Sequence, residues 1–237
     1  MQHGVISKIF LAIITIFYTN LSIASTKDHA IEYLQSLNMD VLAINQNENL
    51  NNISLKTALT SQGLVYFDEK NGLFFVRTKP LIRVGNQFDF ADRTFIEQYL
   101  SQIKDTVNAK STNEKLVAYV FTDISCNWCQ QLHNQINAYL SKGITLKFLY
   151  FPRNGLESIE ARQMSTISQQ EDQLSALSNA FNGQYVEPKQ VNETVKNHFL
   201  SGVGIGVERT PGIVVNGYLF EGYLSPEQLE DMFMQVK

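Results

Sequence analysis

The feature that most constrains this chain is its only pair of cysteines, which are separated by two residues in Cys126-Asn127-Trp128-Cys129. The pair follows an apolar run at 116–121, which predicts a strand, and opens a segment at 127–142 with the pattern of a helix. Cys126 is then expected at the helix N-cap, where unpaired backbone N–H groups and the helix dipole favour a thiolate. We therefore predict that Cys126 is the attacking sulfur of a redox-active disulfide and that Cys129, one turn further along, is the resolving thiol.

Other uses of a closely spaced cysteine pair need to be considered. A c-type haem site requires a histidine directly after the second cysteine, where this chain has Gln130. Zinc could bind both cysteines and His133, but the chain has no second cysteine pair and one helix cannot supply a tetrahedral set of ligands. A purely structural disulfide would close too small a loop to add much stability. Redox catalysis without a metal or cofactor is the leading interpretation, and the zinc site and the structural disulfide remain as alternatives.

Composition and charge indicate an ordinary folded protein. The 237 residues are 44% hydrophobic and carry a net charge of -4, and at roughly 150 residues per domain this length suggests one large domain or two modest ones. No strongly basic segment is present, so we do not expect nucleic acid as a partner.

The first 24 residues have the pattern of a secretory signal peptide. A weakly basic lead at 1–8 is followed by an apolar run at 9–18, and small residues at Ser22 and Ala24 suit cleavage after Ala24. The alternative is a retained membrane anchor, but the largely apolar stretch at 9–23 is shorter than the ~20 residues that a spanning helix needs. A cleaved signal would place the mature protein in an oxidising compartment, where thiols persist only if something keeps them reduced.

Residues 25–83 are predicted to form a small α+β domain. The spacing of Ile31, Leu34 and Leu37 indicates a short helix, and an asparagine-rich break follows at 45–52. Three short runs, at 54–59, 64–67 and 73–78, predict an antiparallel sheet with a turn that ends at Asn71-Gly72. Because so small a domain buries little of its surface, we expect it to complete its core against a second copy of itself.

Residues 84–110 are predicted to be a linker, with an amphipathic helix over 93–107 and a polar loop from 108 onwards. The second domain, 111–237, begins with a strand, a helix and a strand at 116–121, 127–142 and 144–151, the order typical of a covered parallel sheet. The remaining predicted elements are helical segments in 156–182 and at 192–200, a glycine-rich turn at 202–206, a hairpin at 212–221 across Asn216-Gly217, and a last helix opened by Ser225-Pro226-Glu227-Gln228.

Three motifs together resemble the DsbC/DsbG family of periplasmic thiol:disulfide interchange proteins. They are Phe121-Thr122-Asp123-Ile124-Ser125-Cys126 running into Cys129-Gln130-Gln131-Leu132-His133, then Phe151-Pro152-Arg153-Asn154-Gly155-Leu156, then Arg209-Thr210-Pro211. The resemblance extends over nearly the whole chain after the signal segment. It implies a V-shaped homodimer with a cystatin-like N-terminal dimerisation domain, a linker helix, and a thioredoxin-like α/β domain with a helical insertion. It also implies a DsbD-type membrane reductant that keeps the cysteine pair reduced.

By the same resemblance, Thr210-Pro211 is the cis-proline loop beside the active-site sulfurs. The backbone of residue 210 could pair with an extended substrate, and Trp128 between the cysteines is expected to contact substrate as well. The chain departs from the family in having no cysteines in the helical insertion, so the polar residues at 165–170 are expected to be accommodated by packing alone. It also has Val120 where thioredoxins often place a buried carboxylate, and His133 is interpreted as a surface or packing residue rather than a proton shuttle.

The sequence therefore predicts a periplasmic protein disulfide isomerase that acts on misoxidised or unfolded secreted proteins. A DsbG-like reductase of sulfenylated cysteines is the main alternative, since the same dithiol could reduce a sulfenic acid. A holdase-type chaperone that binds unfolded chains without chemistry is the third possibility.

Overall fold

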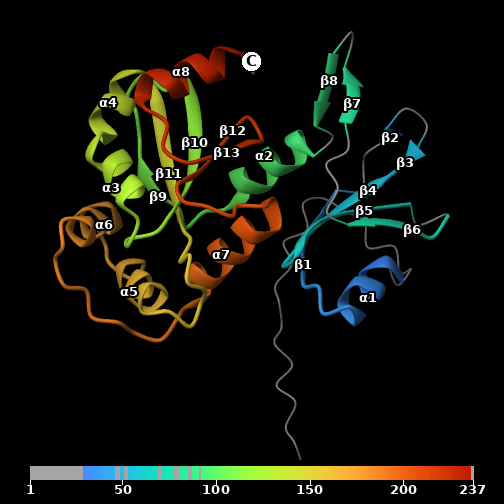
Figure 1. Cartoon of the computed structure of the whole chain (residues 1–237), viewed down its shortest axis with the longest axis horizontal. Coiled ribbons are helices and arrows are strands. Elements are labelled where there is room, and N and C mark those ends of the chain that lie inside the picture. Colours follow the sequence, from blue (N-terminus) through green and yellow to red (C-terminus); the bar gives the residue numbers. More distant parts are fainter. Residues whose placement is uncertain are drawn as a thin grey trace, which may run out of the picture.

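The computed structural model describes residues 29–45, 49–50, 53–68, 71–76, 81–84, 87–90 and 92–235, and the predicted signal segment at 1–24 lies outside them. Two larger sheets organise this part of the chain, and Figure 1 shows helices α2 (Arg93–Gln102) and α7 (Glu193–Ile205) between them. No helix within the described ranges has the length and apolar character needed to cross a membrane.

The first sheet is antiparallel, with strand order β1-β4-β5-β6. Its strands are β1 (Val41–Asn45), β4 (Lys56–Thr60), β5 (Gly63–Asp68) and β6 (Leu73–Val76). Helix α1 (His29–Ser36) contributes Ala30 and Leu34 to a small core that also holds Val65 and Phe67. Apart from their ends, the predicted helix and three strands of this domain are confirmed, and the predicted turn has Gly72 at a φ of +66°. Residues 77–78 of the third predicted strand lie outside the described ranges.

Three features of this region are not predicted by the sequence pattern. They are strand β1, the short ladder of β2 (Asn49–Leu50) with β3 (Ile53–Ser54), and the hairpin of β7 (Leu81–Val84) with β8 (Gln87–Phe90). Strand β1 is short, and its first four residues are all apolar, so no alternating pattern marks it. Its register against β4 also shifts between Val41 and Ala43. The β7–β8 hairpin lies across residue 83, where the first domain is predicted to end.

The predicted linker helix over 93–107 is wrong at its C-terminal end. Helix α2 stops at Gln102, because Ile103 turns to an extended conformation while its N–H bonds to the carbonyl of Leu100. Val107 instead begins the edge strand β9 (Val107–Ala109), which pairs antiparallel with β11 (Ile144–Tyr150). Val107 is buried as its helical spacing suggests, but it is buried in the sheet.

The second sheet has the order β13-β12-β10-β11-β9. Strand β10 (Leu116–Thr122) runs parallel to β11, which confirms the predicted strand–helix–strand unit. Strands β12 (Gly212–Val215) and β13 (Tyr218–Glu221) form the predicted hairpin, whose turn residues Asn216 and Gly217 both have positive φ. The end of β10, which leads to the cysteines, therefore lies between β11 and β12.

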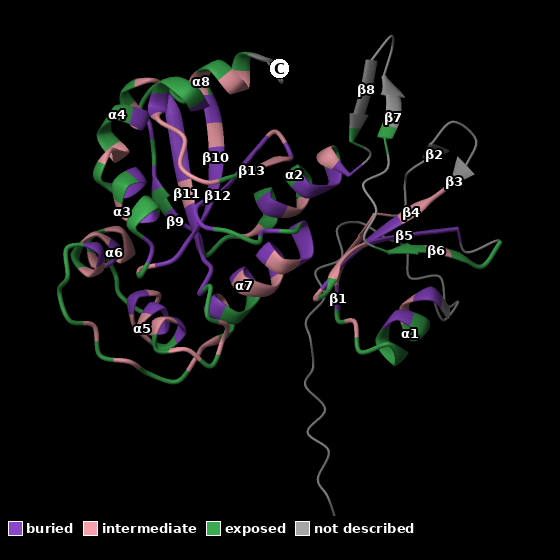
Figure 2. Ribbon diagram, in the orientation of Figure 1, coloured by how far each residue is buried: buried purple, intermediate pink, exposed green. Residues whose placement is uncertain are grey.

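Helices cover both faces of the second sheet, whose strands are largely buried in Figure 2. Alternate residues of β10 enter two separate cores: Ala118 and Val120 join the core with both cysteines, and Phe121 joins the core with α2 and α7. The other helices are α3 (Asn127–Asn134), α4 (Ile136–Ser141), α5 (Ile159–Ile167), α6 (Gln173–Phe181) and α8 (Pro226–Gln235). The single helix predicted at 127–142 is thus two helices that meet at Gln135, and the predicted capping box of the last helix is confirmed by reciprocal bonds between Ser225 and Gln228.

The predicted turn at 202–206 is wrong, because helix α7 continues to Ile205 and ends at Gly206, whose φ is +97°. The two glycines inside the helix lie where there is no room for a side chain. A Cβ at Gly202 would lie 2.5 Å from the ring of Phe151, and one at Gly204 would lie 2.8 Å from the backbone oxygen of Thr60 in β4. These glycines therefore allow α7 to pack closely against Phe151 on one side and against β4 of the first sheet on the other.

The helical insertion is held by hydrogen bonds as well as by packing, so the expectation of packing alone is corrected. The side-chain amide of Asn192 donates to the carbonyl of Ser165 and to Ser168 Oγ, and its backbone N–H donates to Ser165 Oγ. Asn192 also caps α7 by accepting from the N–H of Val195. One side chain thus joins the C-terminal half of α5 to the start of α7.

Candidate functional site

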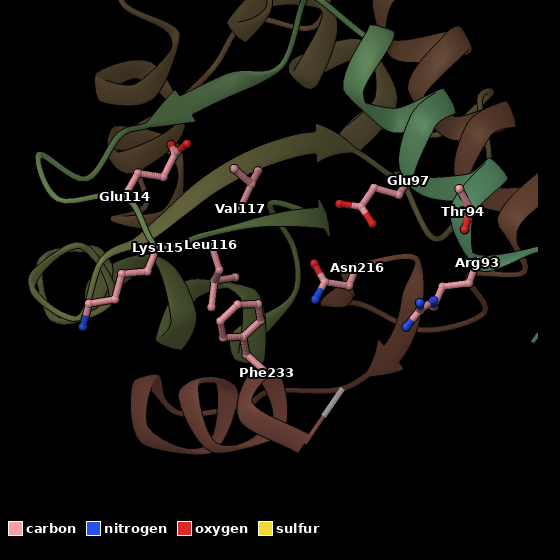
Figure 3. A pocket seen from close by; sticks show the side chains of 9 residues that line it. All are labelled: Arg93, Thr94, Glu97, Glu114, Lys115, Leu116, Val117, Asn216 and Phe233. Atoms are coloured by element: carbon pink, nitrogen blue, oxygen red, sulfur yellow. The ribbon is translucent and has the colours of Figure 1, made fainter. Parts of the chain in front are cut away.

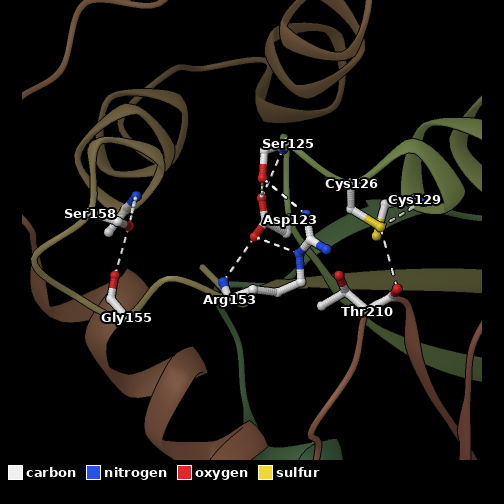
Figure 4. Close-up of polar contacts among 9 residues, drawn as sticks. Asp123, Ser125, Cys126, Cys129, Arg153, Gly155, Ser158 and Thr210 are labelled. Carbon is white, nitrogen blue, oxygen red and sulfur yellow. Dashed lines mark hydrogen bonds and ion pairs between the residues drawn. The ribbon is translucent and has the colours of Figure 1, made fainter.

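Cys126 and Cys129 lie at the start of α3, immediately after the central strand β10 (Figure 4). Cys126 is the N-cap residue, with an extended backbone, and its Sγ accepts a hydrogen bond of 3.3 Å from the N–H of Cys129. Both side chains are free thiols, and Cys126 is 4% exposed against 1% for Cys129. The structure thus places the two cysteines as predicted, although the outer sulfur is itself largely covered.

The two thiols differ in acidity because Cys126 accepts a hydrogen bond from Cys129, while Cys129 is the more deeply buried of the two. The side-chain hydrogen bond from Cys129 is the main effect that lowers the pKa of Cys126, to about 5, against the opposing effect of burial. Burial and the neighbouring Cys126 raise the pKa of Cys129. The pair therefore favours a thiolate on Cys126 and a protonated thiol on Cys129.

The loop before β12 closes the other side of the sulfurs. The peptide bond between Thr210 and Pro211 is cis, and Cys126 Sγ lies 3.3 Å from the carbonyl oxygen of Thr210, to which the thiol form donates. Thr210 and Pro211 are both buried, and Thr210 Oγ1 has no hydrogen-bond partner in the described part of the chain. Two segments that are 84 residues apart in sequence are thereby brought into contact at one atom.

Asp123 and Arg153 form a polar network next to Cys126, and neither is among the predicted site residues. The fully buried carboxylate of Asp123 accepts from the backbone N–H of Ser125 at 2.8 Å, from Ser125 Oγ at 2.7 Å, and from the backbone N–H and Nε of Arg153 at 2.8 and 3.1 Å. The positive charge of Arg153 also contributes to the lowered pKa of Cys126. Both residues lie in the motifs that carry the family resemblance, and this was the signal that could have identified them.

Trp128 lies at the rim of the site rather than in it. Its side chain is 58% exposed and stacks on the ring of Tyr223, with ring centroids 5.9 Å apart and an interplanar angle of 24°. Tyr223 is in turn fixed by a hydrogen bond of 2.9 Å from its hydroxyl to Gln135. This arrangement holds an apolar ring in solvent within two residues of Cys126.

His133 is a packing residue rather than a surface residue. Its ring lies between Phe148 and Phe181, its Nε2 is 2.6 Å from Ser178 Oγ, and burial lowers its pKa to about 4. Within the described ranges, no three or more histidine, cysteine, aspartate or glutamate side chains form a group that could hold a metal ion.

One cleft in the described part of the chain lies away from the cysteines. It has a volume of about 490 Å³ and opens between α2, the start of β10 and α8 (Figure 3). Its lining residues are Arg93, Thr94, Glu97, Glu114, Lys115, Leu116, Val117, Asn216 and Phe233, none of which is a predicted site residue. The chemistry predicted from the cysteines therefore belongs to the start of α3 and not to this cleft.

Comparisons with known proteins show which proteins this chain is similar to. Residues 103–237 match the family model described as a thioredoxin-like domain. The chain is 34% identical over 225 residues to the thiol:disulfide interchange protein DsbC of Haemophilus influenzae, which covers 94% of this chain and 95% of that protein. It is 32% identical over 180 residues to DsbC of Escherichia coli K12, which covers 75% of each. Among solved structures, a disulfide interchange protein from Neisseria gonorrhoeae is 25% identical with a TM-score of 0.47 and covers 55% of this chain and 94% of that one.

Proposed function

Since this chain belongs to the DsbC family of thiol:disulfide interchange proteins, we propose that it rearranges incorrect disulfides in secreted proteins of the periplasm. It is a thiol:disulfide oxidoreductase with a thioredoxin-like domain. The observation that carries the proposal is the unequal pair of thiols at the start of α3, in which Cys126 favours the thiolate and the more deeply buried Cys129 stays protonated.

The reaction begins when the Cys126 thiolate attacks one sulfur of a wrong disulfide. A mixed disulfide forms between Cys126 and the substrate, and the second substrate sulfur leaves as a thiolate that takes up a proton. In isomerisation another substrate thiolate attacks the mixed disulfide, which returns Cys126 as a thiolate with no net change in oxidation state. In reduction Cys129 loses its proton and attacks Cys126, so the substrate leaves reduced and the pair becomes a disulfide.

The reductive branch needs an external source of two electrons for each turnover. A membrane reductant of the DsbD type would return the oxidised pair to the dithiol by the same exchange chemistry. This partner belongs to the proposal on the strength of family membership.

Substrate recognition is assigned to the surface around Cys126. The cis-proline loop offers the backbone of Thr210 to an extended substrate segment, and the buried Thr210 hydroxyl has no partner in the described ranges. The exposed ring of Trp128 offers apolar contact to side chains next to the substrate cysteine.

The N-terminal domain is proposed to join two copies of the chain, as a cystatin-like dimerisation domain. Strand β6 lies at an edge of its sheet and exposes Leu73, Phe75 and Val76. An exposed apolar edge strand is suited to pairing with another strand, and pairing would bury this surface. Export through a signal peptide cleaved after Ala24 would deliver the protein to the periplasm.

Refolding of scrambled ribonuclease tests the proposed function. Catalytic amounts of the reduced protein should restore ribonuclease activity, and the Cys126→Ser variant should not. A sulfenic acid reductase would leave the scrambled enzyme inactive. A holdase would suppress aggregation of an unfolded client equally well with Cys126→Ser, without restoring activity.

A further inference from the structure

The turn that carries Thr210 is short and is held at both ends. On one side Val207 is buried in the core with α7, and its N–H bonds to the carbonyl of Gly202 at 2.8 Å. On the other side the carbonyl of Pro211 accepts from the N–H of Gly222 at 2.8 Å. Between these points, Glu208 and Arg209 lie exposed at the surface.

The exposed part of the turn is bound by one side chain from the neighbouring strand. Glu221 is the last residue of β13 and pairs in register with Gly212. Its Oε1 accepts hydrogen bonds from the backbone N–H groups of Glu208 and Arg209, at 2.7 and 2.8 Å. Hydrogen bonds from backbone N–H groups to a carboxylate are roughly twice as strong as those between neutral groups.

We infer that Glu221 is a positioning residue of the exchange site, whose carboxylate holds the 207–211 turn so that Thr210 stays against Cys126. This inference rests on the proposed function. Without the carboxylate, two adjacent N–H groups would be left to water and the turn would be held only at Val207 and Pro211. The contact of 3.3 Å between Cys126 Sγ and the Thr210 carbonyl depends on that turn.

The consequence for catalysis depends on the substrate. A peptide that pairs with the backbone of Thr210 requires the turn in place before the thiolate attacks, because small displacements of a positioned group are costly. A small disulfide such as oxidised glutathione needs chiefly the Cys126 thiolate. Loss of the Glu221 contact should therefore weaken reaction with peptides more than reaction with small disulfides.

The test compares Glu221→Ala and Glu221→Gln with Glu187→Ala, which removes an exposed carboxylate from the loop between α6 and α7. Second-order reduction rates are measured for a disulfide-bonded peptide and for oxidised glutathione. We expect Glu221→Ala to lose about five- to tenfold with the peptide and less than about twofold with glutathione. Glu221→Gln, whose amide oxygen can accept the same bonds, should stay within about twofold of wild type with both substrates. The inference is overturned if Glu221→Ala matches Glu187→Ala with the peptide, or loses equally with both substrates.

Amide hydrogen exchange tests the same contact without relying on activity. In the full-length reduced protein, the N–H groups of Glu208 and Arg209 should exchange faster in Glu221→Ala than in wild type, and remain protected in Glu221→Gln. Unchanged exchange in Glu221→Ala would also overturn the inference. If the wild-type protein reduces neither substrate, the proposed function fails, and hydrogen exchange still decides whether Glu221 holds the turn.

Discussion

Asp123 is the residue that joins the cysteine turn to the segment after β11. Its carboxylate is fully buried and has donors from Ser125 on one side and from Arg153 on the other. A buried carboxylate is costly unless it is paired, so Asp123 and Arg153 depend on each other. The pairing brings a positive charge near Cys126 without a direct hydrogen bond to its sulfur among the contacts described.

The acidity of Cys126 predicts how its reactivity depends on pH. Because the pKa is lowered to about 5, the thiolate fraction should rise as pH increases through 5 and be nearly complete at pH 7. The measurement is the rate of alkylation by iodoacetamide as a function of pH, for the reduced wild type and for Cys129→Ala. In wild type the rate should follow the thiolate fraction of Cys126. In the variant the midpoint should move upward, because the hydrogen bond from Cys129 is the main cause of the shift. A wild-type midpoint near about 8.5, the value for a free thiol, would contradict the assignment.

Arg153→Gln should raise the pKa of Cys126 and weaken the fold. The variant removes a positive charge near the thiolate and the Nε donor to Asp123, while the backbone N–H of residue 153 stays in place. We expect a loss of about 1–3 kcal/mol in the free energy of unfolding, because a buried carboxylate loses a charged partner. Urea unfolding and the pH profile of alkylation measure the two effects. Arg153→Lys keeps the charge and should shift the pKa less, and a pKa unchanged in Arg153→Gln would exclude the electrostatic role.

At the level of helices and strands, the predictions succeed where the signal is local. The N-cap position of Cys126, the Asn216-Gly217 turn and the box of Ser225 with Gln228 depend on neighbouring residues, and all three are confirmed. The end of α7 is missed because its glycines are required by Phe151 and Thr60, which are distant in sequence. The end of α2 is missed because Val107, whose spacing fits the apolar face of a helix, lies in strand β9 instead.

The same distinction applies to the site. The two cysteines and the cis-proline loop could be predicted, the first from helix chemistry and the second from the family resemblance. Arg153 could have been found only through the family motif that contains it, because its partner Asp123 is 30 residues away. Glu221 could not be predicted, because its partners are 12 to 13 residues away and no periodic pattern connects them.

Gly202→Ala should destabilise the protein although alanine is the better helix former. The added Cβ would overlap the ring of Phe151, and forcing such a contact in a packed core costs about 1–3 kcal/mol, which exceeds the gain of about 1 kcal/mol in helix propensity. Urea unfolding of the full chain measures the difference. The matched control is Asn197→Ala at an exposed position of the same helix, which should be neutral or stabilising. A Gly202→Ala variant as stable as the control would show that the close packing is not needed.

At the scale of the whole molecule, α7 connects the site to the N-terminal sheet. Gly204 packs against Leu59 and Thr60 of β4, and α7 then leads through Val207 into the turn that carries Thr210. In the same sheet, β6 is an edge strand, separated from β4 by β5, and its apolar side chains are exposed. The dimer that we propose would therefore place two copies of the exchange site in one assembly, which suits a substrate with more than one wrong disulfide.

Disruption of the β6 edge should separate the subunits. Phe75→Lys places a charge on an exposed apolar position of the edge strand, so we expect the wild type to sediment as a dimer at micromolar concentration and the variant as a monomer. Analytical ultracentrifugation makes the measurement, and far-UV circular dichroism verifies that the variant is folded. The monomer should still reduce small disulfides while losing most isomerase activity. A monomeric wild type would rule out dimerisation as proposed.

The central claim, that Cys126 attacks and Cys129 resolves, is tested most directly by trapping the mixed disulfide. Cys129→Ser should accumulate disulfide-linked adducts with a scrambled client, because the attacking thiolate remains and the intramolecular release is gone. Cys126→Ser should accumulate none, since the remaining thiol is buried and its pKa is raised. The adducts are seen on a non-reducing gel and disappear with reductant. Adducts that accumulate with Cys126→Ser instead of Cys129→Ser would contradict the account.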